Sequence, residues 1–208
     1  MRDTLRLYFL GFYAISLFVF LIKIIPASLR VPRVERRAHG LARLLAPGLV
    51  LFDFVLPPAI VLARVGELDV RWIPLRALGF FSSLYAAVML LWASATLGRF
   101  LVPQAVVLAD HDLVTRGPYR LLRHPAYSGD LALWLGVALG TVNLLLLALW
   151  PVSALGTYCQ TRQEEELLGS KFGAAYERYA TQTGRLVPRF NLRSVYTRGQ
   201  AASLAAVR

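Results

Sequence analysis

The stretch YSGDLALWLGVALGTVNLLLLALWPVSALGTYC, residues 127–159, decides the fold. It is largely apolar, but it is too long for one membrane crossing, which takes about 20 residues. The polar interruption Thr141-Val142-Asn143 divides it. The sequence therefore predicts a tight hairpin of two helices, Ala126–Gly140 and Leu144–Cys159, although each half is short for a complete span.

Three further apolar runs are long enough to cross a hydrocarbon core of about 30 Å. They are Leu5–Ile25, Leu41–Ala63 and Pro74–Leu97. The first has no small-residue cleavage site, which favours a retained helix over a signal peptide. Since 57% of the 208 residues are hydrophobic, the composition agrees with a membrane protein. The sequence predicts an all-α, multi-pass membrane helix bundle with about five transmembrane helices.

Loop charge orients this bundle. The connection after the first apolar run has only Glu35 against five arginines, namely Arg30, Arg33, Arg36, Arg37 and Arg43. This loop should face the cytoplasm by the positive-inside rule. Five crossings then place the N-terminus outside, and they place residues 111–129 and the C-terminus on the cytoplasmic side. The net charge of +11 suits anionic lipid headgroups, at about 1 kcal/mol per basic residue near the surface, and needs no nucleic acid.

The chain divides into three parts: helices with their loops over 1–98, a cofactor-binding region over 99–190, and a tail over 191–208 that we expect to be disordered. From Arg162 the apolar positions recur at helical spacing until Gly184 and Pro188 stop the pattern. We expect an amphipathic helix against the membrane face, whose aromatic stripe of Phe172, Tyr176 and Tyr179 serves packing. The single cysteine, Cys159, excludes an intramolecular disulfide and a cysteine-based zinc cluster.

Reactive side chains gather in the connection His111–Gly129, HDLVTRGPYRLLRHPAYSG. Pro125 favours an extended His124 and suits the first turn of the next helix, whose N-terminus attracts an anionic group such as a carboxylate. Downstream, the adjacent carboxylates of residues 164–166 repel one another, so at least one should meet a cation. The residues alone are equally compatible with a binding site and with an interfacial salt-bridge cluster.

The spacing H-x-L-V-x-x-G-x-Y-x-x-x-R-H-P-x-Y-x-G over residues 111–129 resembles the signature of isoprenylcysteine carboxyl methyltransferases and related phospholipid methyltransferases. The paired glutamates, Phe172-Gly173, Tyr176 and Tyr179 resemble the C-terminal element of the same family. The resemblance covers roughly residues 104–188. It implies an integral membrane enzyme that transfers a methyl group from S-adenosylmethionine, bound at the cytoplasmic face, to a lipophilic acceptor, without a metal.

The resemblance also implies which residues contact the cofactor. A helix start beside His124 suits a carboxylate, the paired glutamates suit the ammonium or ribose, and a tyrosine suits the cationic sulfur or the adenine ring. The predicted cofactor-binding residues are Gln104, His111, Asp112, Leu113, Val114, Tyr119, His124, Pro125, Ala126, Tyr127, Glu164 and Glu165.

The acceptor is less defined. In the isoprenylcysteine enzymes, an arginine four residues before the first paired glutamate is expected to hold the substrate carboxylate, and here that position is Gln160. Arg162 and Arg123 are the candidates for acceptor positioning, although a lipid headgroup contact is as good an interpretation of Arg162. Prenylated cysteine carboxylates, phospholipid amines and small lipophilic thiols or amines all remain open.

Other classes account for parts of the pattern. Sterol-type reductases, which use a nicotinamide cofactor, share a similar tyrosine and RHP pattern, but the glutamate pair with Phe172-Gly173 favours a methyltransferase. A transporter usually places ionisable residues near the bilayer midplane, where Asp53 is the main candidate, and we expect Asp53 to pack within the bundle. A non-catalytic scaffold needs no such pattern. The oligomeric state is not predicted, since lipid-facing and partner-facing apolar surfaces look alike in sequence.

Overall fold

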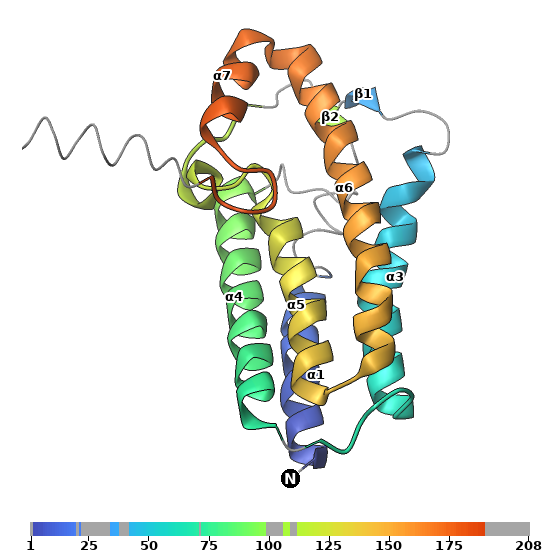
Figure 1. The fold of residues 1–208 in the computed structure, drawn as a ribbon. Coiled ribbons are helices and arrows are strands. Elements are labelled where there is room, and N and C mark those ends of the chain that lie inside the picture. Colours follow the sequence, from blue (N-terminus) through green and yellow to red (C-terminus); the bar gives the residue numbers. More distant parts are fainter. Residues whose placement is uncertain are drawn as a thin grey trace, which may run out of the picture.

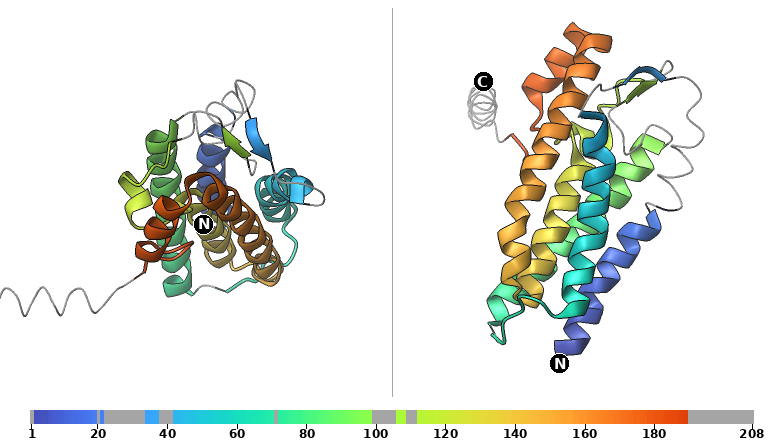
Figure 2. Two further views of the ribbon diagram at one scale, coloured as in Figure 1. Left: turned by 90° about the horizontal axis from the view of Figure 1, so that it is seen from above. Right: turned by 90° about the vertical axis from the view of Figure 1, so that its right-hand side faces the viewer.

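The computed structural model describes residues 2–19, 21, 34–37, 42–70, 72–98, 106–108 and 112–189. Its longer helices are α1 (Arg2–Val19), α3 (Ala42–Ala63), α4 (Ile73–Leu97), α5 (Pro125–Thr141) and α6 (Leu144–Phe172). These run side by side along one bundle axis, and the short helix α7 (Ala174–Gln182) folds back at one end (Figures 1 and 2). The tail expected to be disordered, 191–208, lies outside the described residues.

The helical class predicted from the sequence is confirmed. The bounds of α3 and α4 agree with the predicted runs to within one residue, whereas the last part of Leu5–Ile25 lies outside the described residues. Within the described residues, two helices, α4 and α6, are long and apolar enough to cross a membrane. The five crossings and their orientation stay predictions.

The predicted hairpin is present as α5 and α6, and its turn is tied to the connection that follows α3. Val142 adopts a left-handed conformation, with φ of 53°. The completely buried Asn143 caps α6, where its Oδ1 accepts a hydrogen bond from the Leu146 N–H at 3.0 Å. Its Nδ2 donates to the Val65 carbonyl at 2.8 Å. The polar interruption therefore ends one helix, starts the next and fastens both to α3.

The predicted end of the second hairpin helix at Cys159 is wrong. Helix α6 continues to Phe172, so the separate interfacial helix expected from Arg162 consists instead of the last turns of α6 and the short α7. Nothing between Cys159 and Arg162 stops a helix, because the polar residues that follow are good helix formers. The break comes at Gly173, whose φ of 50° favours glycine.

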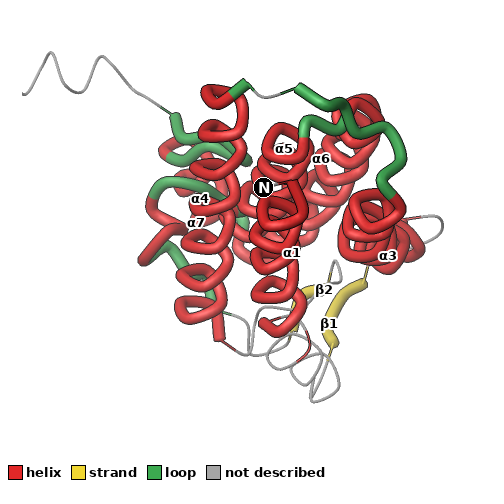
Figure 3. The backbone as a smooth tube through the Cα atoms, turned by 90° about the horizontal axis from the view of Figure 1, so that it is seen from below, coloured by secondary structure: helices red, strands yellow, loops and turns green. Residues whose placement is uncertain are grey.

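Helices α4 and α5 pack closely through glycines. A Cβ atom added at Gly79 of α4 would meet the backbone of Gly136 and Gly140 on α5. Small residues of this kind let two membrane helices approach each other. Around this contact lies an apolar core that includes Phe9, Trp134 and Leu146, and α1 lies among α3, α4 and α5 (Figure 3).

Two short strands, not predicted from the sequence, modify the all-α expectation. β1 (Val34–Arg37) pairs antiparallel with β2 (Val106–Leu108). A 3-10 turn, η3 (Gly117–Arg120), follows β2 along the chain. The pairing brings Arg36 and Arg37 of the Arg-rich loop to the end of the bundle that also carries η3 and α7 (Figure 1). The predicted common side of the three charged regions stays a prediction.

Candidate functional site

The backbone of two segments meets where α5 begins. The Arg123 N–H donates to the Gly184 carbonyl at 2.8 Å, and the His124 N–H donates to the Arg185 carbonyl at 3.1 Å. Leu122 and Gly184 form a parallel bridge. A Cβ at Gly184 would collide with the Val187 carbonyl oxygen, so the return of the chain after α7 depends on glycine here. This contact fixes residues 122–124 beside the segment that follows α7.

Glu165 lies at the centre of a charged cluster. Its Oε1 accepts hydrogen bonds from Arg123 Nε at 2.7 Å and Arg185 Nε at 3.0 Å, and its Oε2 accepts one from Arg185 Nη2 at 2.6 Å. His124 Nε2 lies 3.2 Å from Oε1. The side chain of Glu165 is only 13% exposed. The expectation that one of the three adjacent carboxylates meets a cation is confirmed.

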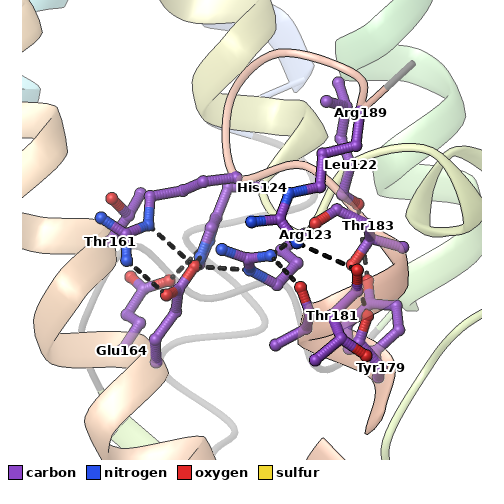
Figure 4. Close-up of polar contacts among 12 residues, drawn as sticks. Leu122, Arg123, His124, Thr161, Glu164, Tyr179, Thr181, Thr183 and Arg189 are labelled. Atoms are coloured by element: carbon purple, nitrogen blue, oxygen red, sulfur yellow. Dashed lines mark hydrogen bonds and ion pairs between the residues drawn. The ribbon is translucent and has the colours of Figure 1, made fainter. Parts of the chain in front are cut away.

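The two arginines of this cluster have further partners in the protein. Arg123 Nη1 donates to the carbonyls of Ala180 and Thr183, at 2.8 and 2.6 Å, where α7 ends (Figure 4). Carbonyls at a helix C-terminus attract cations. The Arg185 guanidinium lies over the Tyr158 ring, 5.0 Å from its centroid. Arg123 and Arg185 therefore hold the cluster together as well as neutralising Glu165.

His124 is buried between the two glutamates. Its Nδ1 lies 3.6 Å from Glu164 Oε2, opposite the contact of Nε2 with Glu165. Burial alone would lower the pKa of His124, but hydrogen bonds and charge interactions with the two carboxylates outweigh it and raise the pKa. His124 is also the N-cap of α5, yet its side chain makes no capping hydrogen bond, so the first N–H groups of α5 are not capped by that side chain.

The hydrogen bonds to Glu164 come from neutral side chains, and His124 lies beside its other carboxylate oxygen. Glu164 Oε1 accepts a hydrogen bond from the Tyr127 hydroxyl at 2.6 Å and from Gln160 Nε2 at 3.3 Å. Gln160 is completely buried, and its Oε1 is a buried atom without a hydrogen-bond partner in the described part of the chain. The two adjacent glutamates thus have different hydrogen-bond donors, two arginines for Glu165 and two neutral side chains for Glu164, while His124 contacts both.

The other predicted cofactor residues differ in whether the structure describes them and in how deeply they are buried. Gln104 and His111 lie outside the described residues, Asp112 is exposed, and Leu113 and Val114 are half-buried. Tyr119 is buried in η3, where burial raises the pKa of its hydroxyl and its carbonyl accepts a hydrogen bond from the Tyr179 hydroxyl at 2.8 Å. Pro125 and Ala126 form the first turn of α5.

Arg162 does not join the cluster. Its side chain is 58% exposed and pairs with Glu166 at 3.6 Å along the outer face of α6. Residues four apart share a helix face, so Arg162 and Glu166 share one face while Gln160 and Glu164 share another. The position four residues before Glu164 is therefore the one that faces the site, and Gln160 occupies it.

Sequence reasoning missed Arg185, which forms two hydrogen bonds with Glu165. The available signal was a cation directly after Gly184, the residue predicted to stop the helix. The sequence could not show that this cation, Arg185, binds Glu165. Arg185 is placed by the backbone hydrogen bond between His124 and Arg185, which joins residues about 60 positions apart. Tyr176 is buried with its ring edge-on to Tyr179, in agreement with the packing role expected of the stripe.

Comparison with known proteins finds a family that this architecture resembles. Residues 75–175 match the family described as phospholipid methyltransferase, and this range includes α5, both glutamates and Gln160. This part of the chain is similar to that family. Two curated relatives, from Oryza sativa subsp. indica and Oryza sativa subsp. japonica, are named "Probable protein-S-isoprenylcysteine O-methyltransferase", and each is 40% identical over 84 residues.

The matched segment covers 38% of this chain and 42% of each relative. The resemblance stated from the sequence is thereby confirmed for the phospholipid methyltransferase region. Arg185 and most of α7 lie beyond the residues matched to the family.

Proposed function

We propose that this protein is a membrane methyltransferase that uses S-adenosylmethionine and methylates a lipophilic acceptor. The observation that carries the proposal is the arrangement of His124 between Glu164 and Glu165 at the start of α5, inside the region that matches the family. A lone salt-bridge network needs neither a helix start without a side-chain cap nor a buried, unpaired amide oxygen beside it.

The residues fit the chemical parts of S-adenosylmethionine, which supplies an electrophilic methyl group on a sulfonium when bound. The uncapped N-terminus of α5, at Pro125 and Ala126, suits the carboxylate. Glu164 suits the ammonium or the ribose hydroxyls, and Tyr127 and Tyr119 suit the cationic sulfur or the adenine. We assign Gln104, His111 and residues 112–114 to the same site from the resemblance.

The contacts around the site hold its side chains in fixed positions before the acceptor binds. Methyl transfer depends mainly on holding the acceptor atom on axis at about 3–3.5 Å from the methyl carbon. Glu165 is fixed by Arg123 and Arg185, so we assign Arg123 to positioning the site through Glu165. Arg162 faces outward, which suits an acceptor or lipid headgroup arriving at the surface of the bundle.

We also propose that the bundle spans the membrane several times with the site on the cytoplasmic side. Large apolar side chains project outward from α4, as expected for a lipid-facing helix: Leu78, Phe81, Leu84, Val88 and Leu91 are all exposed. The Arg-rich loop at the end that carries the site supports the cytoplasmic orientation.

A nicotinamide-dependent reductase of the sterol type is the competing proposal, and the family match favours the methyltransferase. Binding of S-adenosylmethionine or of NADPH to the detergent-purified protein separates the two. We expect binding of S-adenosylmethionine only.

The site is tested by measuring the affinity for S-adenosylmethionine in His124→Ala and Glu164→Ala, followed by a screen of acceptors for transferred methyl label. Losing one charged hydrogen bond costs about 1.5–3 kcal/mol, so we expect a loss of at least about tenfold in each variant. Glu166→Ala is the matched control, because Glu166 is 70% exposed on the outer face of the same helix. Unchanged affinity in both site variants would contradict the assignment.

A further inference from the structure

Gln160 is a polar side chain beside Glu164 that the described part of the chain leaves incompletely paired. It lies on α6 one turn before Glu164, and none of its surface is exposed. Its Nε2 donates to Glu164 Oε1 at 3.3 Å, on the oxygen that also accepts the Tyr127 hydroxyl. Its Oε1 is buried and has no hydrogen-bond partner among the described residues.

The orientation of this amide follows from its neighbour. An ionised carboxylate only accepts hydrogen bonds, so the NH2 group must face Glu164, and the carbonyl oxygen must point away from it. Leaving a buried acceptor unpaired costs about 1–3 kcal/mol. A bound molecule that donates a hydrogen bond to this oxygen would remove that cost.

The interior side of the site is rich in acceptors as well. The carboxyl groups of Asp53 and Asp130 share a hydrogen bond within the bundle. Ser153, two turns before Gln160 on the same helix face, donates to Asp53 at 2.7 Å. Asp53 is buried there, as expected from the sequence.

The arginines near the site pair with Glu165 and Glu166 rather than with Gln160 or Glu164. Arg123 and Arg185 bind Glu165, and Arg162 pairs with Glu166 on the outer face. A free carboxylate placed at Gln160 would meet the oxygens of Gln160 and Glu164 rather than one of these guanidinium groups, and His124 is already shared between the two glutamates. A headgroup with an N–H or O–H would satisfy the unpaired oxygen instead.

We infer that Gln160 determines acceptor specificity and that its Oε1 accepts a hydrogen bond from an amine or hydroxyl headgroup, in preference to a free carboxylate. The inference rests on the proposed function. In the transfer, the nitrogen or oxygen of the acceptor forms the bond to the methyl carbon, and the sulfur–methyl bond breaks with its electron pair staying on sulfur. The displaced proton of the headgroup passes to water.

The test compares two probes with one apolar tail, S-farnesylcysteamine, which carries an amine, and S-farnesyl-3-mercaptopropionate, which carries a carboxylate. Transfer of labelled methyl is measured with the full chain in lipid nanodiscs. We expect the wild type to methylate the amine at least about tenfold faster, the equivalent of one hydrogen bond. Gln160→Leu should lose about tenfold in kcat/KM for the amine while its affinity for S-adenosylmethionine stays within about twofold, and Gln160→Arg should move the preference toward the carboxylate.

Thr157→Val is the matched control, since Thr157 is buried on the same helix and the change removes one hydroxyl. It should leave the preference between the probes unchanged. The inference would be overturned if the wild type preferred the carboxylate probe, or if it bound S-adenosylmethionine but methylated neither probe. Both results come from the wild type, so they do not depend on whether a variant folds. Equal losses of cofactor affinity and amine turnover in Gln160→Leu would also overturn it, because the oxygen would then serve the cofactor. Failure of the wild type to bind S-adenosylmethionine would instead contradict the proposed function.

Discussion

At the scale of single residues, two adjacent glutamates have different environments. Neighbours on an α-helix point about 100° apart, so Glu165 reaches Arg123 and Arg185 while Glu164 reaches Tyr127 and Gln160. His124 contacts both carboxylates. One glutamate is thus fixed by two arginines, and the other accepts its hydrogen bonds from neutral donors, with His124 between them.

The charged cluster should contribute to stability. Glu165→Gln leaves two partly buried guanidinium groups without a carboxylate, and we expect a loss of about 3 kcal/mol in the free energy of unfolding, as for a broken buried pair. Glu166→Gln, at an exposed pair on the same helix, should change it by less than about 0.5 kcal/mol. Denaturation of both variants in detergent measures the difference, and equal effects would contradict the structural role of Glu165.

The raised pKa of His124 predicts a pH dependence. The protonated form is favoured in the folded state, so its contribution to stability is fully present below the unfolded pKa of about 6.5. It should be lost as the pH rises through the folded pKa. We expect Tm to fall between neutral pH and the higher folded pKa in the wild type, and to fall less in His124→Gln. Parallel curves for the two proteins would show that another group is responsible.

At the scale of elements, the glycine contact between α4 and α5 sets how closely the two helices approach. Gly79→Ala places a methyl group against the backbone of Gly136 and Gly140, and overpacking of this kind costs about 1–3 kcal/mol. Gly11→Ala on α1 is the control, since a Cβ there meets nothing within 4 Å. It should be neutral or slightly stabilising. Thermal unfolding of both variants tests the contact. Equal Tm values for the two variants would show that the glycine contact does not limit how closely α4 and α5 pack.

The turn between α5 and α6 depends on Asn143. Asn143→Ala removes the cap of α6 and the bond to Val65, and leaving the buried Leu146 N–H unpaired should cost about 1–3 kcal/mol. Asn143→Ser retains a capping oxygen, so it should cost about half as much. The two variants are compared by chemical denaturation. Identical losses would mean that the cap contributes little.

At the scale of the whole molecule, the sequence predicts the elements better than their contacts. Apolar length located α3 and α4, and Thr141-Val142-Asn143 located the hairpin turn. The continuation of α6 was missed because a change of polarity does not end a helix. For the site, the position of His124 at a helix start was predictable from Pro125, whereas the contact of Arg185 with Glu165 depends on how the chain returns after α7.

The proposed membrane orientation makes a prediction about the two ends of the bundle. Val70 lies in the connection after α3, and Glu177 lies on α7 at the opposite end (Figure 1). In a Cys159→Ser background, a membrane-impermeant maleimide should label Glu177→Cys from the cytoplasmic side and Val70→Cys from the other side. Labelling of both positions from one side would contradict the orientation.

The unbroken course of α6 has a consequence for how such a chain can change in length. Ser153, Gln160 and Glu164 lie on one rigid helix, so their separations along the axis are set by a rise of 1.5 Å per residue. A single inserted residue between Ser153 and Gln160 would shift one relative to the other by that rise and turn it by about 100°. An insertion of about seven residues, close to two full turns, would restore the facing direction, and it would lengthen the helix by about 10 Å. A change in the length of α6 would therefore also change the distance along the bundle axis between Ser153 and the site residues Gln160 and Glu164.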